Sequence, residues 1–254
     1  MVALHSPIQV IEFFHLAFLE VLQVRLDQTR YVLKGGANLR FFFRSPRYSE
    51  DLDLDAVRID QWRLEEKVDQ VLASRPIELI LRAQSLKISA VTKPKQTATT
   101  QRWKLSLSVA GRGEPVRAKI EFSRRSPDDR CKVDQIPPDV VAPYALRPPT
   151  VNRYLPIAMV EQKIVALLER SETQPRDVFD LDLLFQQWRD KEELHPSMTS
   201  RLDAAAARVL ELTFAGYDSL VVRFLDPEIV ELYNRQGHWE QMQLRVAERL
   251  RNLK

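Results

Sequence analysis

The amino-acid sequence predicts an α+β protein, with a mixed β-sheet and flanking helices first and a helical bundle after it. Apolar or alternating segments that suit strands lie before residue 123. A proline-dense stretch at 137–156 follows, and apolar residues beyond it recur at helical spacing. Because proline disfavours regular helices and central strands, we predict a first domain at 1–136. A helical domain is predicted at 137–254, after a proline-rich linker.

The composition is that of a soluble globular protein, with 254 residues, 44% of them hydrophobic and 29% charged. The net charge is only +3, so a surface that binds RNA must arise from local segregation of charge. The single cysteine, Cys131, excludes an internal disulfide and a cysteine-rich zinc site. We recognise neither a signal peptide nor an apolar run long enough to span a bilayer. We therefore expect a cytoplasmic monomer that does not contact membranes.

The first predicted element is a helix at 8–26, which should pack behind a strand at 31–33. Its apolar stripe consists of Ile11, Phe14, Phe18, Val21 and Leu22. His15 lies within this helix and is expected to be structural. A second helix is predicted at 60–73, with Asp60 as its N-cap.

A glycine bend follows the strand at 31–33. Gly35 and Gly36 end the strand, and residues 37–43 have the apolar spacing of a short helix. The first N–H groups of a helix lack partners within the helix, and glycine lets the backbone approach a ligand closely. The bend is therefore suited to bind an anion such as phosphate.

An acidic strand is predicted after the basic loop at 44–49. Asp51, Asp53 and Asp55 alternate with Leu52 and Leu54, so the three carboxylates should share one face. Carboxylates this close repel one another, and a hard divalent cation would stabilise them. We predict that Asp51 and Asp53 hold one or two Mg²⁺ ions, or Mn²⁺ in their place. The alternative is a solvated loop or edge strand that carries surplus charge.

Three further strands are predicted, at 77–91, 102–109 and 116–122, with a polar turn at 93–100. In the last of these, Glu121 lies on the polar face beside Arg117 and Lys119. It could bind a metal, or it could be an ordinary strand glutamate paired with either cation. The basic loop at 123–130 carries Arg124, Arg125 and Arg130. It could contact RNA phosphates or simply be solvated.

Helices are predicted through the rest of the chain, at 157–170, 176–188, 201–212, 226–233 and 239–253. Lys163 and Arg170 lie two turns apart and therefore on one helix face. Glu161 and Lys163 are expected to be exposed. Arg176 and Asp180 are one turn apart and could pair.

These motifs together resemble the AbiEii/AbiGii-type toxin family, within the minimal nucleotidyltransferase superfamily. The chain carries GG…LR…R-x-S-x-D-x-D, then E-x-K-x-x-A-L-x-x-R, then R-D-x-x-D, over roughly residues 31–188. The resemblance implies a nucleotidyltransferase sheet and Mg²⁺-dependent transfer of a nucleotide from a nucleoside triphosphate to RNA. The implied acceptor is the 3′ end of tRNA, whose modification blocks translation. A type IV toxin also implies a cognate antitoxin encoded nearby, whose direct binding stays open.

The resemblance also assigns roles to individual residues. Glu121 matches the third carboxylate beside Asp51 and Asp53. Lys163 matches the lysine assigned to the nucleotide phosphates, and Asp177 matches an active-site aspartate. The residues expected to bind the nucleotide are Lys34, Gly35, Gly36, Arg47, Ser49 and Lys163. Ala37 stands where many relatives have serine or threonine, so phosphate would be held there by backbone N–H groups.

Other functions remain open from the sequence. The acceptor could be a small molecule or a protein hydroxyl group instead of RNA. The chain could also be a catalytically silent module that binds a nucleotide or a partner. A metal-dependent hydrolase has less support, because the sequence holds neither H-E-x-x-H nor G-x-S-x-G and only 4 histidines.

Overall fold

The computed structural model describes residues 6–124, 129–188 and 193–253. The chain forms two compact units. The first unit comprises Met1–Phe42 and Tyr48–Tyr154, and the second comprises Phe43–Arg47 and Leu155–Lys254.

The described part of the first unit contains a seven-stranded sheet in the order β3-β4-β5-β2-β1-β7-β6. The strands are β1 (Tyr31–Lys34), β2 (Asp51–Ala56), β3 (Leu86–Gln96), β4 (Thr100–Val109), β5 (Val116–Ser123), β6 (Cys131–Gln135) and β7 (Thr150–Tyr154). Strand β2 runs parallel to β5, and β1 runs parallel to β7, whereas the other pairs are antiparallel. The prediction of a mixed sheet is therefore confirmed.

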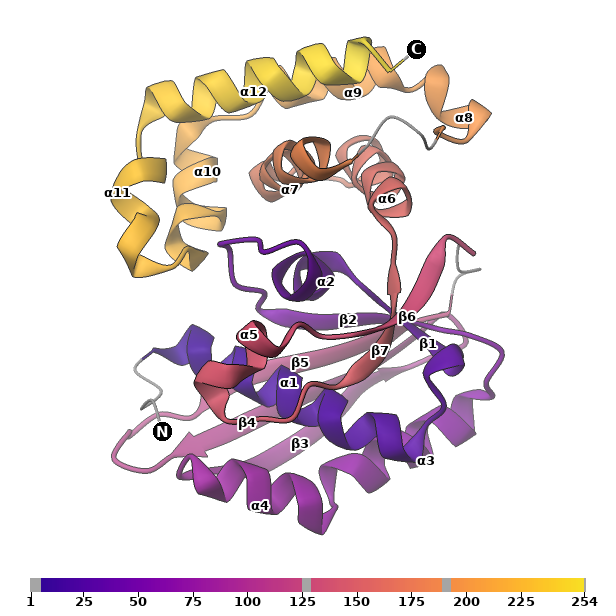
Figure 1. The fold of residues 1–254 in the computed structure, drawn as a ribbon, viewed down its shortest axis with the longest axis vertical. Helices are drawn as coiled ribbons and strands as arrows, with labels where there is room; N and C mark the ends of the chain where they lie inside the picture. The colour runs from indigo at the N-terminus through magenta and orange to yellow at the C-terminus, as the bar shows by residue number, and fades with distance from the viewer. Residues whose placement is uncertain (1–5, 125–128, 189–192, 254) are drawn as a thin grey trace. The chain divides into compact units, whose positions relative to one another are not determined.

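Helices cover both faces of this sheet (Figure 1). The helices are α1 (Pro7–Arg25), α2 (Gly35–Phe42), α3 (Gln61–Leu72), α4 (Arg75–Ala83) and the short α5 (Pro138–Val141). Helix α1 contacts α3, α4 and β5, and its apolar residues join the same core as Leu52 and Leu54. Helix α2 packs on β1 and β2 from the face to which Asp53 points. This arrangement leaves the acidic face of β2 next to the start of α2.

The segment predicted as a strand at 77–91 is wrong in its first half, which forms helix α4. Ser74 caps this helix by accepting a hydrogen bond from the Ile77 N–H group, and Pro76 lies in its first turn. Ile77 and Leu81 are one turn apart and buried, which anchors the helix on the core. Strand β3 begins at Leu86 and continues to Gln96 through the first half of the predicted turn.

The domain boundary also differs from the predicted one. Strand β7 lies beyond residue 136 and still belongs to the sheet, because it pairs with both β1 and β6. The prolines flank β7 rather than interrupt it, since Pro149 precedes Thr150 and Pro156 follows Tyr154. The boundary therefore lies between Tyr154 and Leu155 instead of after Ile136.

Helix α1 corrects a further expectation. By length and composition alone, its 19 residues could cross a membrane, although no run of that kind was expected. In the structure 67% of the apolar window is buried, and Val10, Phe14 and Phe18 lie in the core at 0% exposure. A buried core helix passes the same test of length and composition, so this match is weak evidence for a membrane span.

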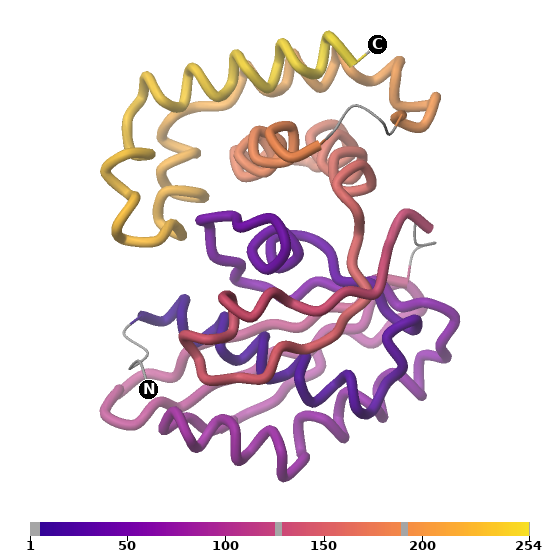
Figure 2. The backbone as a smooth tube through the Cα atoms, viewed as in Figure 1, coloured from indigo at the N-terminus to yellow at the C-terminus, as the bar shows by residue number. Residues whose placement is uncertain are grey.

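The second unit is helical, as predicted. Its helices are α6 (Pro156–Glu169), α7 (Pro175–Gln187), α8 (Pro196–Thr199), α9 (Leu202–Leu210), α10 (Phe214–Leu220), α11 (Val230–Tyr233) and α12 (Gln236–Arg251). Helix α6 packs on α7 and α9, and α12 runs along α9 (Figure 2). Trp239 and Tyr217 stack with ring centroids 4.5 Å apart in its core.

A loop from the N-terminal part of the chain belongs to this helical unit. The Gln187 side chain donates to the Phe43 carbonyl oxygen at 2.7 Å, and the Asp226 N–H group donates to the Pro46 carbonyl oxygen at 3.3 Å. Arg47 forms an isolated antiparallel bridge with Leu225. The loop between α2 and β2 is thus held by residues that follow it by more than a hundred positions.

Candidate active site

Gly35 sits directly over the carboxylate of Asp53. It has a φ of +65°, a conformation that L side chains rarely adopt. A Cβ atom on Gly35 would lie 3.0 Å from Asp53 Oδ2. Glycine is therefore required here both by the backbone conformation and by the close approach of the carboxylate. The predicted glycine bend is present, and α2 begins at Gly35 itself.

The strand register gathers charged residues on one face beneath this bend. Asp53 pairs with Lys34 on β1 and with Glu121 on β5. Glu121 in turn pairs with Arg102 on β4. Leu52 and Leu54 are fully buried on the opposite face. The predicted alternation of β2 is therefore confirmed, and Asp51, Asp53 and Glu121 share one face.

The carboxylates of this face perturb one another. Burial raises the pKa of Asp53, and the negative charges of Asp51 and Glu121 raise it further, whereas Lys119 and Lys34 oppose the rise. Lys119 Nζ lies 2.7 Å from Asp51 Oδ2, and Arg102 Nε lies 2.6 Å from Glu121 Oε2. The partner of Glu121 is thus Arg102 rather than Lys119 or Arg117. Two of the three carboxylates of this face therefore already have a cationic partner.

Asp55 has a different role from the two aspartates before it. Its carboxylate accepts hydrogen bonds from the Lys34 ammonium group and, at 2.7 Å, from the Tyr154 hydroxyl group. Lys34 also donates to Ser123 Oγ at 2.9 Å. These contacts join β1, β2, β5 and β7. They use the Lys34 ammonium group within the sheet, so its assignment to a nucleotide stays a prediction.

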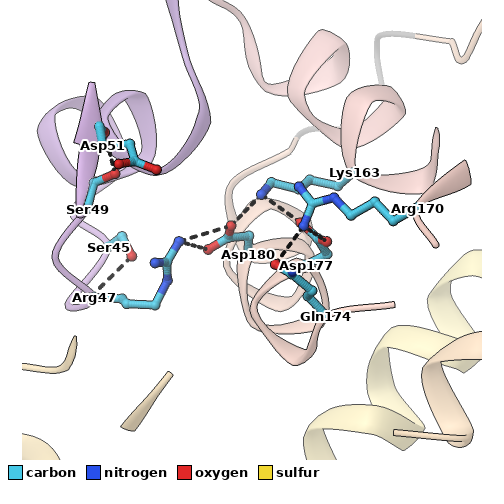
Figure 3. Close-up of polar contacts among 9 residues, drawn as sticks. All are labelled: Ser45, Arg47, Ser49, Asp51, Lys163, Arg170, Gln174, Asp177 and Asp180. Atoms are coloured by element: carbon cyan, nitrogen blue, oxygen red, sulfur yellow. Dashed lines mark hydrogen bonds and ion pairs between the residues drawn. The ribbon is translucent and has the colours of Figure 1, made fainter. Parts of the chain in front are cut away.

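Ser49 lies just before β2. Its hydroxyl group donates to the Asp51 carbonyl oxygen at 2.8 Å (Figure 3). This bond fixes the start of the acidic strand, and the expected contact between Ser49 and a nucleotide also stays a prediction.

The carboxylates of Asp51, Asp53 and Glu121 are ligands of the chemical type that a divalent cation prefers. In the described parts of the chain, no three Asp, Glu, His or Cys side chains converge into a complete metal site. However, Asp51, Asp53 and Glu121 offer hard oxygen ligands on one face, and their mutual repulsion would be relieved by a cation. Lys119 and Arg102 neutralise two of these carboxylates in the present arrangement. A metal ion would have to compete with these two side chains.

The second unit contains a buried cluster of five charges (Figure 3). Lys163 Nζ lies 2.9 Å from Asp177 Oδ1 and 2.6 Å from Asp180 Oδ2. Arg47 Nη2 lies 3.2 Å from Asp180 Oδ1, and Arg170 Nη1 lies 2.9 Å from Asp177 Oδ2. Both aspartate side chains are 0% exposed. Three cations therefore surround two buried carboxylates.

The charges of this cluster keep its acids ionised. Burial alone would raise the pKa of Asp180, but the neighbouring charges of Arg47 and Lys163 outweigh it and hold that pKa below its usual value. Lys163 and Glu161 are buried, which corrects the expectation that both are exposed. Asp180 pairs with Arg47 and Lys163 rather than with Arg176.

The sequence could not predict the contact between Arg47 and Asp180 in this cluster. Arg47 and Asp180 are 133 positions apart, so no local periodicity connects them. Their only signal was membership of two separate motifs. The nucleotide-binding roles expected for Arg47 and Lys163, and the catalytic role expected for Asp177, stay predictions. Arg125 of the basic loop lies outside the described residues.

Comparison with known families decides the class of protein. The profile of the family described as "Nucleotidyl transferase AbiEii toxin, Type IV TA system" matches residues 17–252. The chain belongs to the AbiEii nucleotidyltransferase toxin family. Membership of the AbiEii family confirms the resemblance seen in the motifs. It also implies a nucleotide substrate and a cognate antitoxin.

Two solved structures that are similar to this AbiEii protein come from Helicobacter pylori. The crystal structure of JHP933 matches with a TM-score of 0.63 and 20% identity, covering 98% of this chain and 96% of that chain. A second protein, described as a candidate nucleotidyltransferase, matches with a TM-score of 0.61 and 20% identity, covering 94% and 96%. At this identity the likeness shows a shared fold. No curated protein sequence matches the chain.

Proposed function

We propose that this AbiEii-family toxin transfers a nucleotide from a nucleoside triphosphate to RNA in a reaction that requires Mg²⁺ or Mn²⁺. The observation that carries the proposal is the row formed by Lys34, Asp53 and Glu121 beneath Gly35. It combines carboxylate ligands for a cation with the N-terminus of a helix, which favours phosphate.

The carboxylates and the backbone N–H groups have different parts in the proposed reaction. Asp51, Asp53 and Glu121 would hold the divalent cation, which when bound neutralises the charge of the triphosphate. Backbone N–H groups at the start of α2 would receive phosphate oxygens, with Ala37 contributing its backbone alone. The hydroxyl group of the acceptor attacks the α-phosphorus, a carboxylate accepts its proton, and pyrophosphate leaves.

The proposed acceptor is the 3′ end of tRNA. A nucleotide added there would prevent aminoacylation and so arrest translation. This acceptor follows from the resemblance to AbiEii-type toxins, and the toxin class of the family supports it. The antitoxin would counter this activity, either directly or by another route.

The test is transfer of label from an α-³²P nucleoside triphosphate to total tRNA in the presence of Mg²⁺. We expect Asp53→Asn to lower the rate by about 10²-fold or more, because it removes a carboxylate from the reacting centre. Asp60→Asn is the matched control, since Asp60 is exposed and its side chain makes no capping hydrogen bond. Transfer by Asp53→Asn at the wild-type rate would refute the site. Label on protein instead of tRNA would refute the acceptor.

A further inference from the structure

One face of the first unit's sheet is strongly basic. Strands β3, β4 and β5 each place polar residues on the face opposite the apolar core. Trp103, Leu105 and Leu107 of β4 are nearly fully buried on the core side. The cations on the other side, here called the basic sheet face, are Lys87, Lys95, Arg102, Lys104, Arg117 and Lys119.

The strand register places these cations side by side. Lys119 on β5 pairs with Lys104 on β4, and Arg102 on β4 pairs with Lys95 on β3. Cross-strand neighbours lie about 5 Å apart, so like charges here repel one another. Among the described residues, no carboxylate forms an ion pair with Lys104 or Arg117, and both are exposed. Such unneutralised charge is the electrostatic footprint of a polyanion site.

The basic sheet face is continuous with the proposed active site. The row that contains Lys104 and Lys119 continues to Asp51 on β2. Lys119 and Arg102, at the border, pair with Asp51 and Glu121. A chain that lies along this face would therefore reach the carboxylates without leaving the sheet.

The other side chains of this face indicate which polyanion fits. The cations are separated by small hydroxyl residues such as Ser106, Ser108 and Thr92, which donate readily to phosphate. In the described strands β3 to β5, no aromatic side chain points to this face. Protein interfaces are enriched in aromatic anchors, and single-stranded RNA is usually bound by stacking on aromatic rings. Contacts to phosphates alone suit a base-paired RNA backbone.

We propose that the basic sheet face binds the phosphodiester backbone of a base-paired stem in the acceptor RNA. This inference rests on the proposed function, because it assigns the surface that holds the substrate of that same site. The acceptor's reactive end would extend from the stem toward Asp53. Binding here is independent of base sequence, because the face offers charges and hydroxyl groups only.

The test is the salt dependence of binding to total tRNA, measured by fluorescence anisotropy without nucleotide between 50 and 200 mM salt. We expect Lys104→Gln combined with Arg117→Gln to lower the slope of log K against log salt by about 1.4–1.8, since each phosphate contact contributes ~0.7–0.9. Affinity at the higher salt should fall about tenfold. Circular dichroism would verify that the variant folds.

Arg63→Gln combined with Arg223→Gln is the matched control, since both arginines are exposed and lie off this face. It removes the same charge and should leave the slope within about 0.5 of wild type. An equal loss in both double variants would indicate a general charge effect and overturn the proposal. So would wild-type binding by the Lys104/Arg117 variant.

Further arms separate this inference from the proposed reaction and from other partners. Asp53→Asn should bind tRNA like wild type although it transfers little label. If the wild-type protein binds tRNA through this face but transfers no label, only the proposed chemistry is refuted. Double-stranded DNA, polyglutamate and vesicles of phosphatidylglycerol are the competing probes. Tighter binding to any of these than to tRNA, lost in the same double variant, would overturn the assignment of this face to RNA.

Discussion

At the scale of single residues, the position of the Asp53 carboxylate requires glycine at position 35. The glycine adopts a positive φ, and its missing side chain leaves the space that the Asp53 carboxylate occupies. Asp53 in turn is a half-buried acid whose neighbours on β2 and β5 are also acidic. A backbone that is held this close to a charged group is typical of a site that binds a ligand rather than of a stable core.

Gly35→Ala should therefore damage both the fold and the site. The alanine would be strained at a φ of +65°, which disfavours L-residues by about 1–2 kcal/mol, and its Cβ would press on Asp53 Oδ2. We expect the midpoint of thermal unfolding to fall by ~2–6 °C and nucleotide transfer to fall with it. Gly113→Ala is the control, because a Cβ there meets nothing within 4 Å. An active and equally stable Gly35→Ala variant would contradict this account.

At the scale of secondary-structure elements, buried ion pairs connect two helices and a loop of the second unit. Asp180 on α7 joins Lys163 of α6 to Arg47 of the loop that precedes β2. Buried ion pairs stabilise a fold only weakly overall, but loss of one partner leaves an uncompensated charge away from water. This cluster therefore holds one arrangement of α6, α7 and the loop at 43–47.

Asp180→Asn should destabilise the protein by about 3–5 kcal/mol, because Arg47 and Lys163 would lose a buried counter-charge. Urea unfolding at neutral pH would measure the change. Glu211→Gln breaks an exposed pair with Arg208 and should change stability by less than ~0.5 kcal/mol. If the two variants unfold at the same urea concentration, the cluster does not stabilise the second unit.

The elements differed in how far the sequence could predict them. The alternation in 51–55 and 116–122 gave the strands and their faces correctly, because each has one buried face. The sequence predicts a strand at 77–91, but the first part of this segment belongs to helix α4, because its short apolar run fits both periods. Strand β7 was missed because prolines surround it and only tertiary pairing with β1 and β6 defines it.

The site was predictable in part for the same reason. Gly35, Asp51, Asp53 and Glu121 belong to local patterns whose faces are set by the chain's own period. The Arg47–Asp180 pair depends on a contact between segments 133 positions apart, which no local pattern encodes. The partner of Glu121 was likewise set by the register between β4 and β5.

Two acids act in opposite directions on the stability of the whole molecule. The pKa of Asp53 is raised in the folded state, so its ionisation destabilises the fold as pH rises above its usual value of 3.8. The pKa of Asp180 is lowered, so its contribution is full above 3.8 and is lost as pH falls through its folded value. Stability near neutral pH therefore includes a penalty from the first acid and a gain from the second.

We expect Asp53→Asn to stabilise the metal-free protein by about 1 kcal/mol at pH 7, or ~2–4 °C in the unfolding midpoint. The gain should shrink as pH falls towards 3.8 and disappear below it, where wild-type Asp53 is protonated in both states. Thermal unfolding at pH 7 and near pH 4, with a chelator present, would measure both values. A variant less stable than wild type at pH 7 would show that Asp53 does not carry the predicted penalty.

The loop at 43–47 affects how the chain is synthesised and how its two units could be recombined with those of homologues. Arg47 is synthesised 133 positions before Asp180, so the ion pair between them forms only after the second unit has been made. A chimaera could join the helices of one homologous toxin to the sheet of another. It would then combine residues 43–47 from one parent with helices α6 and α7 from the other. Such a chimaera should fold only if residues 43–47 come from the same parent as the helices that they contact.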